Sequence, residues 1–253
     1  MFKVALLAML LGGAAADTHT PAQAVDAHAL LVRADAPRQQ FLNAKVNVRA
    51  TLSGGDKPDT VSNLELYIGD EDHQLVLFKD SKAKGRKFLL RGDKSWLLVP
   101  GSKHPVAISA NQRMLGKLSV ADLARINLAT DYTGRVRPDL EACPTLDGPG
   151  SAVCRVVDIS AITRLAPYAS GSVWIDGRGL AVHAVFALAS GKPARAVDHG
   201  YVQQGVVWIL KRTVIKDLLS GENSATTTLD YLDHQPARFT HDTFDPDYAL
   251  SHY

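Results

Sequence analysis

Short apolar runs, separated by turns rich in Gly, Asp and Lys, recur along the chain and predict β-strands. In the N-terminal half, four such runs occur at residues 64–68, 75–78, 87–90 and 95–99. Strands of this length joined by short turns are typical of an antiparallel meander. The same pattern returns nearer the C-terminus, over residues 153–159, 172–175, 180–188, 205–219 and 225–232. We therefore expect an α+β protein that is mainly β.

Side chains two residues apart in a strand point to the same face of a sheet. On that basis one face is predicted to carry Phe88, Leu90, Trp96 and Leu98. The alternate positions are also apolar, so the sheet is covered on both sides, or one face binds an apolar ligand. Three aromatic residues of later strands join this candidate ligand-lining set: Trp174, Phe186 and Trp208. Each aromatic residue taken alone is better explained by core packing, whereas together they can line a cavity.

Two helices are predicted outside the strand runs. Thr20 is a candidate N-cap of the first helix, and Pro37 is expected to end or bend that helix. Ser119 with Asp122 predicts the start of a second, short helix that ends near Leu128. Because the second helix lies between two strand regions, we expect it to cover the sheet.

The N-terminus has the three-part order of a secretory signal peptide. Lys3 precedes the apolar run 4–11, and the small residues 12–16 predict cleavage before Asp17. A membrane-anchoring helix is the alternative, but the run is shorter than the roughly 20 apolar residues that span a bilayer. The sequence therefore predicts export of the mature protein.

Composition and charge limit the class of protein. Hydrophobic residues make up 46% of the chain and charged residues 21%, which allows a sizeable core and excludes a disordered chain. The formal net charge of +2 gives no indication of a nucleic-acid partner. No repeat or linker divides the sequence, so residues 1–16 are expected to be the signal peptide and residues 17–253 a single domain.

Candidate catalytic and metal-binding chemistry is sparse. The nine histidines are scattered, and none forms a pair with another ligand at metal-binding spacing. The sequence contains neither a GxSxG elbow nor a phosphate-binding GxxxxGK loop. We therefore predict no catalytic residue, no metal and no cofactor. Cys143 and Cys154 lie close together in a loop rich in Pro and Gly, and in an exported protein they are expected to form a disulfide.

A group of basic residues lies around one predicted turn. It has two interpretations, attraction of anionic lipid heads and protection of an exposed sheet edge by lysines, of which the second is preferred. The group consists of Lys79, Lys82, Lys84, Arg86 and Lys87.

The run from Trp96 to Tyr132 resembles the LolA-like family of outer-membrane lipoprotein-sorting proteins. A Trp-containing strand is followed by Pro100, a Gln-Arg pair, a Gly, a Ser-x-x-Asp motif and a final Asp-Tyr pair. The motif is carried by Gln112, Arg113, Gly116, Ser119, Asp122, Asp131 and Tyr132. Three leucines in the same run, Leu115, Leu118 and Leu123, are expected to cover the ligand site.

The resemblance implies an incomplete antiparallel β-barrel covered by short helices, with a hydrophobic trough for acyl chains. It implies a periplasmic carrier that takes lipoprotein acyl chains or other lipid toward the outer membrane, with an inner-membrane transporter and an outer-membrane acceptor as partners. If the trough is lined as predicted, Trp96 should sense cargo directly. The cysteine loop departs from the family pattern, and a lipoprotein, a free lipid and a polyketide-like lipid remain open as cargo.

Two alternatives to a carrier remain. An accessory subunit of an envelope lipid transporter would share the fold but use the exterior of the protein. A lipid-ester hydrolase would need a Ser or His nucleophile context, which the sequence does not offer.

Overall fold

The structure is a computed structural model that describes residues 25–54, 58–70, 72–80, 84–109, 113–115, 118–119, 122, 126–144, 146, 152–221 and 225–253. The expected signal peptide, its cleavage site before Asp17 and the expected N-cap Thr20 lie outside these residues.

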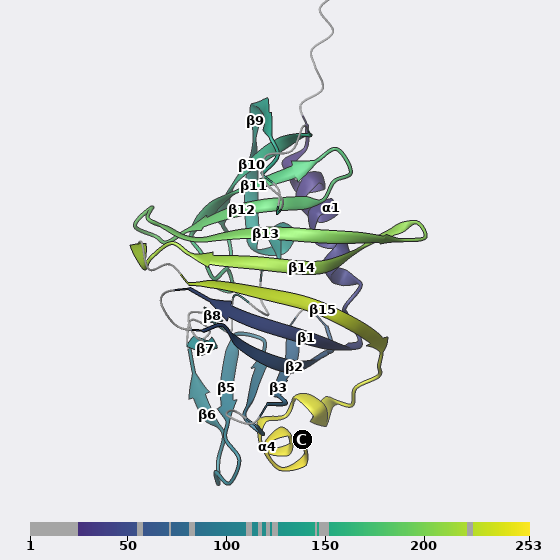
Figure 1. Ribbon diagram of the computed structural model, residues 1–253, viewed down its shortest axis with the longest axis vertical. Coiled ribbons are helices and arrows are strands. Elements are labelled where there is room, and N and C mark those ends of the chain that lie inside the picture. Colours follow the sequence, from purple (N-terminus) through teal and green to yellow (C-terminus); the bar gives the residue numbers. More distant parts are fainter. Residues whose placement is uncertain are drawn as a thin grey trace, which may run out of the picture.

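One antiparallel sheet dominates the described chain (Figure 1). Its N-terminal strands are β1 (Ala44–Ser53), β2 (Thr60–Ile68), β3 (His73–Phe78), β4 (Lys87–Arg91), β5 (Lys94–Leu98) and β6 (Val106–Ile108). Its C-terminal strands are β9 (Tyr132–Ala142), β10 (Val153–Ala161), β11 (Ser170–Asp176), β12 (Ala181–Ala187), β13 (Pro193–Gln204), β14 (Val207–Asp217) and β15 (Thr226–Pro236). The predicted mainly β class is confirmed, while β9 and β13, whose sequences are rich in charged and polar residues, were not predicted as strands.

The sheet is open, as the resemblance implied. Its 13 strands lie in the order β6-β5-β4-β3-β2-β1-β15-β14-β13-β12-β11-β10-β9 over the described residues, so β6 and β9 form opposite edges. The chain therefore passes from one edge to the other between residues 109 and 131, which we call the covering segment. It contains the small hairpin β7 (Arg113–Leu115) and β8 (Leu118–Ser119), a helical Asp122 and the short helix α3 (Leu128–Asp131).

Helix α1 (Ala27–Gln39) packs against one face of the sheet, the inner face. Its N-cap is Asp26, whose side chain accepts a hydrogen bond from His28 N. Pro37 does not end the helix, which continues for two residues beyond it to Gln39; as a proline it leaves the carbonyl of Arg33 without its usual helical hydrogen bond. Leu31 contacts the inner core cluster, and Gly134 of β9 lets α1 approach, since a Cβ there would lie 3.3 Å from Leu31 Cδ1.

The outer face of β2–β5 carries a second apolar cluster. It is covered by the C-terminal segment, which forms η2 (His241–Phe244) and α4 (Pro246–His252) (Figure 1). Lys87 holds this segment, because its Nζ donates hydrogen bonds to Ala249 O at 2.8 Å and Leu250 O at 3.1 Å. The side chain of Lys87 is buried, so Lys87 is not part of an exposed basic surface, unlike the sequence interpretation of the basic group around this turn.

The register of β4 and β5 corrects the predicted face. Phe88 lies opposite Leu97 and Leu89 lies opposite Trp96, and directly paired residues share a face. Phe88 and Leu90 therefore point to the inner face, whereas Trp96 and Leu98 belong to the outer cluster under the C-terminal segment. The sequence prediction correctly placed alternate residues of each single strand on one face. It did not include the register between the two strands, which the tight turn at Gly92 sets.

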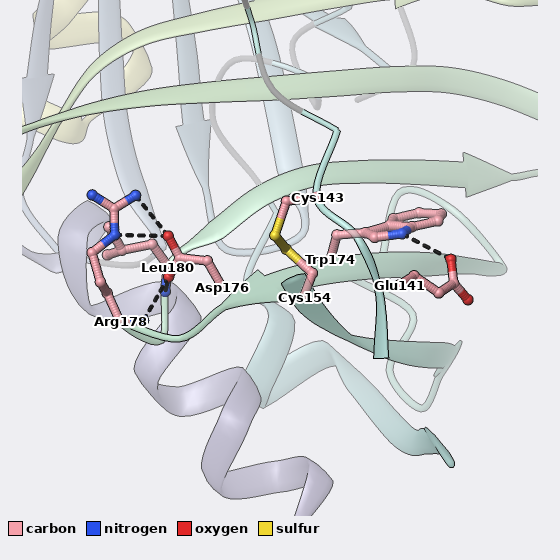
Figure 2. The surroundings of a disulfide bond; sticks show 7 residues. All are labelled: Glu141, Cys143, Cys154, Trp174, Asp176, Arg178 and Leu180. Carbon is pink, nitrogen blue, oxygen red and sulfur yellow. Dashed lines mark hydrogen bonds and ion pairs between the residues drawn. A yellow bond between two sulfur atoms is a disulfide. The ribbon is translucent and has the colours of Figure 1, made fainter. Parts of the chain in front are cut away.

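The disulfide between Cys143 and Cys154 is formed, joining the end of β9 to β10 (Figure 2). Both sulfur-bearing residues are buried with Val182 in a small outer cluster. The bridge closes a local loop, since its two ends are 11 positions apart in the sequence.

We expect the double substitution Cys143→Ser and Cys154→Ser to lower the free energy of unfolding by about 3 kcal/mol or less, because a short loop gains little from closure. Far-UV circular dichroism should remain that of the wild type. Urea melts of the variant and of the oxidised wild type measure the difference, and a variant that fails to fold would contradict a purely local role.

Candidate functional site

A cavity of about 340 Å³ lies between α1, the covering segment and the inner face of the sheet. Its residues come from α1 and the turn that follows it, from β2, β3, β14 and β15, and from the start of α3: His28, Val32, Asp35, Arg38, Gln39, Phe41, Leu42, Leu66, Ile68, Asp70, Gln74, Asn127, Ala129, Thr130, Leu210 and Tyr231. A neighbouring hollow of about 520 Å³ shares His28 and Ala129 with it, but borders Val25, the first described residue. We take the first cavity as the candidate site because side chains of the inner core form its walls.

The interior of the cavity is apolar. Phe41, Leu66 and Leu210 are buried members of the inner core cluster. The ring of Tyr231 stacks on Phe41, with the ring centroids 5.1 Å apart. Toward the rim the lining is exposed and mostly polar, as at Gln39, Asp70 and Thr130. An apolar floor with a polar rim suits a ligand that has one greasy part and one polar end.

Asp35 joins the helix to the covering segment. Its buried carboxylate accepts a hydrogen bond from Ala129 N at 2.8 Å, which satisfies a free N–H group at the start of α3. Ala129 thereby becomes part of the cavity wall, since the short helix is held over the inner face.

Two polar residues of the β2–β3 turn region line the same cavity. Asp70 Oδ1 accepts a hydrogen bond from Asp72 N and lies 2.8 Å from His73 Nδ1. Burial opposes ionisation of Asp70, but these hydrogen bonds outweigh it and hold the pKa of the carboxyl below its usual value. Gln74 is buried, and its Oε1 has no hydrogen-bond partner.

Arg38 brings a positive charge to the cavity and to a narrower space of about 20 Å³ beside it, which His199 and Tyr201 line. Burial and, to a smaller extent, the charge of Arg38 together lower the pKa of His199 to about 3. His199 is therefore neutral at physiological pH, with its Nδ1 3.1 Å from Thr213 Oγ1. Burial likewise raises the pKa of Tyr231.

The Ser-x-x-Asp motif fixes the covering segment to the sheet. Ser119 N and Oγ both donate to Asp122 Oδ2 at 2.9 Å, and Asp122 N donates back to Ser119 Oγ. Tyr168 OH donates to Asp122 Oδ1, and Arg195 Nε donates to Oδ2 at 3.3 Å. Arg195 also binds Asp217 at 2.7 Å, so a buried network connects the segment to β13 and β14.

The rest of the family-like motif is partly described. Asp131 is buried and accepts a hydrogen bond from Thr163 Oγ1 at 2.6 Å, and Tyr132 is a buried member of the inner core. Arg113, Leu115 and Leu118 lie in β7 and β8, but their side chains are outside the described part. Gln112, Gly116 and Leu123 lie outside the described residues altogether.

The candidate ligand-lining residues are dispersed by the fold. Phe186 stacks on Tyr168 in the inner core, with centroids 5.1 Å apart. Trp174 lies on the outer face, where its Nε1 donates to Glu141 Oε2 at 3.1 Å beside the disulfide (Figure 2). Trp208 lines a separate hollow of about 250 Å³ against the other flank of α1, under the guanidinium of Arg178.

None of the seven predicted lining residues is among the residues given above for the cavity, so their binding role stays a prediction. The expectation that Trp96 senses cargo directly is not supported by its place on the outer face. Sequence reasoning missed Asp35 and Gln74. Asp35 lies in a segment that also holds Arg33 and Arg38, and Gln74 directly follows the polar turn at 70–73, so both were expected to be solvated.

Within the described residues, no group of three or more His, Cys, Asp or Glu residues is placed to hold a metal ion. His183 Nδ1 lies 2.6 Å from Asp198 Oδ1, and its ring meets the edge of Trp174. Over the same residues, no helix is long and apolar enough to cross a membrane.

Comparison with known proteins gives one family match. A family model described as that of an uncharacterized protein matches residues 70–248. No curated protein matches the sequence.

Three solved structures share the fold over most of the chain. A LolA superfamily protein from Nitrosomonas europaea superposes with a TM-score of 0.77 at 21% identity, covering 89% of this chain and 100% of that one. A DUF1329 family protein from Desulfovibrio piger gives 0.71 at 15% identity, covering 88% and 97%. A domain from Vibrio parahaemolyticus assigned to outer membrane lipoprotein sorting gives 0.68 at 15% identity, covering 87% and 97%. At these identities the likeness establishes the fold.

We expect His199 to make stability depend on pH. Its folded pKa lies below the ordinary value of 6.5, so between about pH 6.5 and pH 3 the unfolded chain binds a proton that the folded chain does not. The free energy of unfolding should therefore fall as pH falls through this window, by up to about 1.4 kcal/mol per pH unit. Urea melts at pH 7 and pH 5 should show a smaller fall for His199→Gln than for wild type.

The exposed His104 supplies the control, since His104→Gln should retain the pH dependence of the wild type. Equal pH dependence of His199→Gln and wild type would show that His199 is freely protonated in the folded protein.

Proposed function

We propose a carrier function for this chain, which belongs to the family whose model matches residues 70–248 and has the LolA-like fold. In this proposal the protein binds acyl chains, of lipoproteins or of free lipid, in the cavity between α1 and the inner face. It carries them across the periplasm toward the outer membrane without chemical conversion.

The observation that carries the proposal is an apolar cavity closed by a separate chain segment. The floor of the cavity is made of buried core side chains, and its roof includes α3, which Asp35 holds over the inner face. Transfer of an acyl chain from water into such a site is favourable by about 0.8 kcal/mol per methylene. A roof that is continuous with the covering segment offers a way to admit and release cargo.

The size of the cavity limits what it holds in this conformation. At about 340 Å³ it lies at the lower end of the roughly 300–1,000 Å³ that is usual for ligand sites. It therefore suits a single acyl chain or a small lipid. A lipoprotein that carries several acyl chains would require the covering segment to move away from the inner face.

The periplasmic location and the partners belong to the same proposal. The signal-peptide pattern of residues 1–16 supports export. A carrier in that compartment receives cargo from an inner-membrane transporter and delivers it to an outer-membrane acceptor. The neighbour from Vibrio parahaemolyticus is described as an outer membrane lipoprotein-sorting domain, and the shared fold supports cargo of this class.

Extraction of the purified protein with organic solvent, followed by mass spectrometry, tests the proposal directly. We expect an acylated compound in about equimolar amount. Failure to recover one, together with failure to bind a fluorescent fatty acid, would overturn the carrier function.

Substitution at the roof provides a sharper test. We expect Ala129→Phe to lower the affinity for a fluorescent fatty acid at least about tenfold, because the ring would occupy the space into which Ala129 faces. The backbone hydrogen bond from Ala129 N to Asp35 does not depend on the side chain, so the fold should be retained.

The matched control is Ala36→Phe. Ala36 lies on the same helix as Asp35 but is exposed and lines the separate hollow beside Trp208. This variant should bind like the wild type, and an equal loss of affinity in both variants would place the binding site elsewhere.

A further inference from the structure

We propose that the cargo carries a neutral hydrogen-bond donor, a hydroxyl or an amide N–H, at the polar end of its acyl chain, and that Gln74 Oε1 accepts this hydrogen bond. The inference rests on the proposed carrier function and specifies the chemical class of its ligand. It follows from an unpaired polar atom in the cavity wall.

The side chain of Gln74 is an exception to a strong rule. The residue is only 6% exposed, and its Oε1 has no hydrogen-bond partner. Buried polar groups are almost always paired, because a buried acceptor that has lost water without gaining a partner destabilises the fold. A ligand donor in the cavity would satisfy it.

The position of Gln74 directs the side chain into the cavity. It shares the parity of Val76 and Phe78 in β3, both of which belong to the inner core cluster. Across the strand pair it lies opposite Ile68, which also lines the cavity. Gln74 therefore lies beside the turn that carries Asp70, whereas Leu66 and Leu210 form the apolar wall.

The charge around Gln74 selects the kind of polar end. Hydrogen bonds keep the pKa of Asp70 low, so this carboxylate is ionised near neutral pH. The buried carboxylate of Asp35 lines the same cavity, as does the guanidinium of Arg38. An anionic head would meet two carboxylates and a carbonyl oxygen, while a hydroxyl or amide donor has an acceptor in Gln74 and no charge to be repelled.

Ser95 gives an internal comparison. Its Oγ is also buried without a partner, and it lies in the same row of the sheet, opposite Leu90, which in turn lies opposite Gln74. Ser95 is not among the residues that line the cavity. An effect that arises merely from a buried polar group without a partner should therefore appear at both Gln74 and Ser95. An effect that arises from cargo binding should appear only at Gln74.

The experiment compares three probes of one chain length: dodecanol, which has a donor, methyl dodecanoate, which has none, and the dodecanoate anion. Each displaces a fluorescent fatty acid from the full-length mature protein. We expect wild type to bind dodecanol about tenfold more tightly than methyl dodecanoate, the factor produced by about 1.4 kcal/mol. Dodecanoate should bind less tightly than dodecanol.

The variant Gln74→Leu should lose the preference for dodecanol while still binding both neutral probes. Its melting temperature without ligand should rise by about 2–4 °C, because the unpaired acceptor is removed. Ser95→Ala should keep the tenfold preference. Higher stability combined with lost selectivity is not expected of a residue that serves only the fold.

The outcomes separate the two proposals. Binding of both neutral probes with equal affinity by wild type would overturn the inference about Gln74 and leave the carrier function intact. Preference for dodecanoate over dodecanol would overturn it as well. Absence of binding by all three probes and by the fluorescent fatty acid would overturn the carrier function itself.

Discussion

The pairing of β1 with β15 is the constraint on which the architecture depends. β1 pairs with β2 on one side and with β15 on the other, so the N-terminal and C-terminal strands form one sheet. Strands β1–β6 proceed outward to one edge, and β9–β15 return from the opposite edge. The chain between the edges therefore has to cross the molecule, and the inner face gains α3 as part of its roof. A cavity in this place follows from the connectivity of the sheet.

Much of this fold is predictable from the sequence because strand alternation is a local signal. Apolar runs such as 75–78 gave β3, and the cysteine spacing gave the disulfide. The faces of β4 and β5 could not be predicted by counting. If the turn between them were one residue longer or shorter, every side chain of β5 would move to the opposite face of the sheet. The cavity could not be predicted either. Its wall combines Asp35 of α1, Gln74 of β3 and Tyr231 of β15, which no periodicity relates.

The polar residues of the inner face fall into two kinds. Asp122 accepts hydrogen bonds from Tyr168 and Arg195, and Asp131 accepts one from Thr163, so both hold the covering segment in place. Gln74 is buried at comparable depth without such engagement. Satisfied buried networks specify one arrangement of a core, whereas an unsatisfied atom in a cavity wall leaves a position to be completed by a ligand. The inner face thus has one part whose polar groups are fixed by internal hydrogen bonds and another part that can bind a ligand.

The contact between Lys87 and α4 has a consequence for biogenesis. Strands β1–β5 are synthesised well before α4, yet the outer side of Leu75, Leu89 and Leu98 is covered only when that helix docks. During synthesis these strands expose an apolar surface and also lack β15 as a neighbour for β1. Partly made chains of this kind are prone to aggregate. Maturation is therefore completed late, and a holdase that shields the nascent N-terminal strands would raise the yield of folded protein.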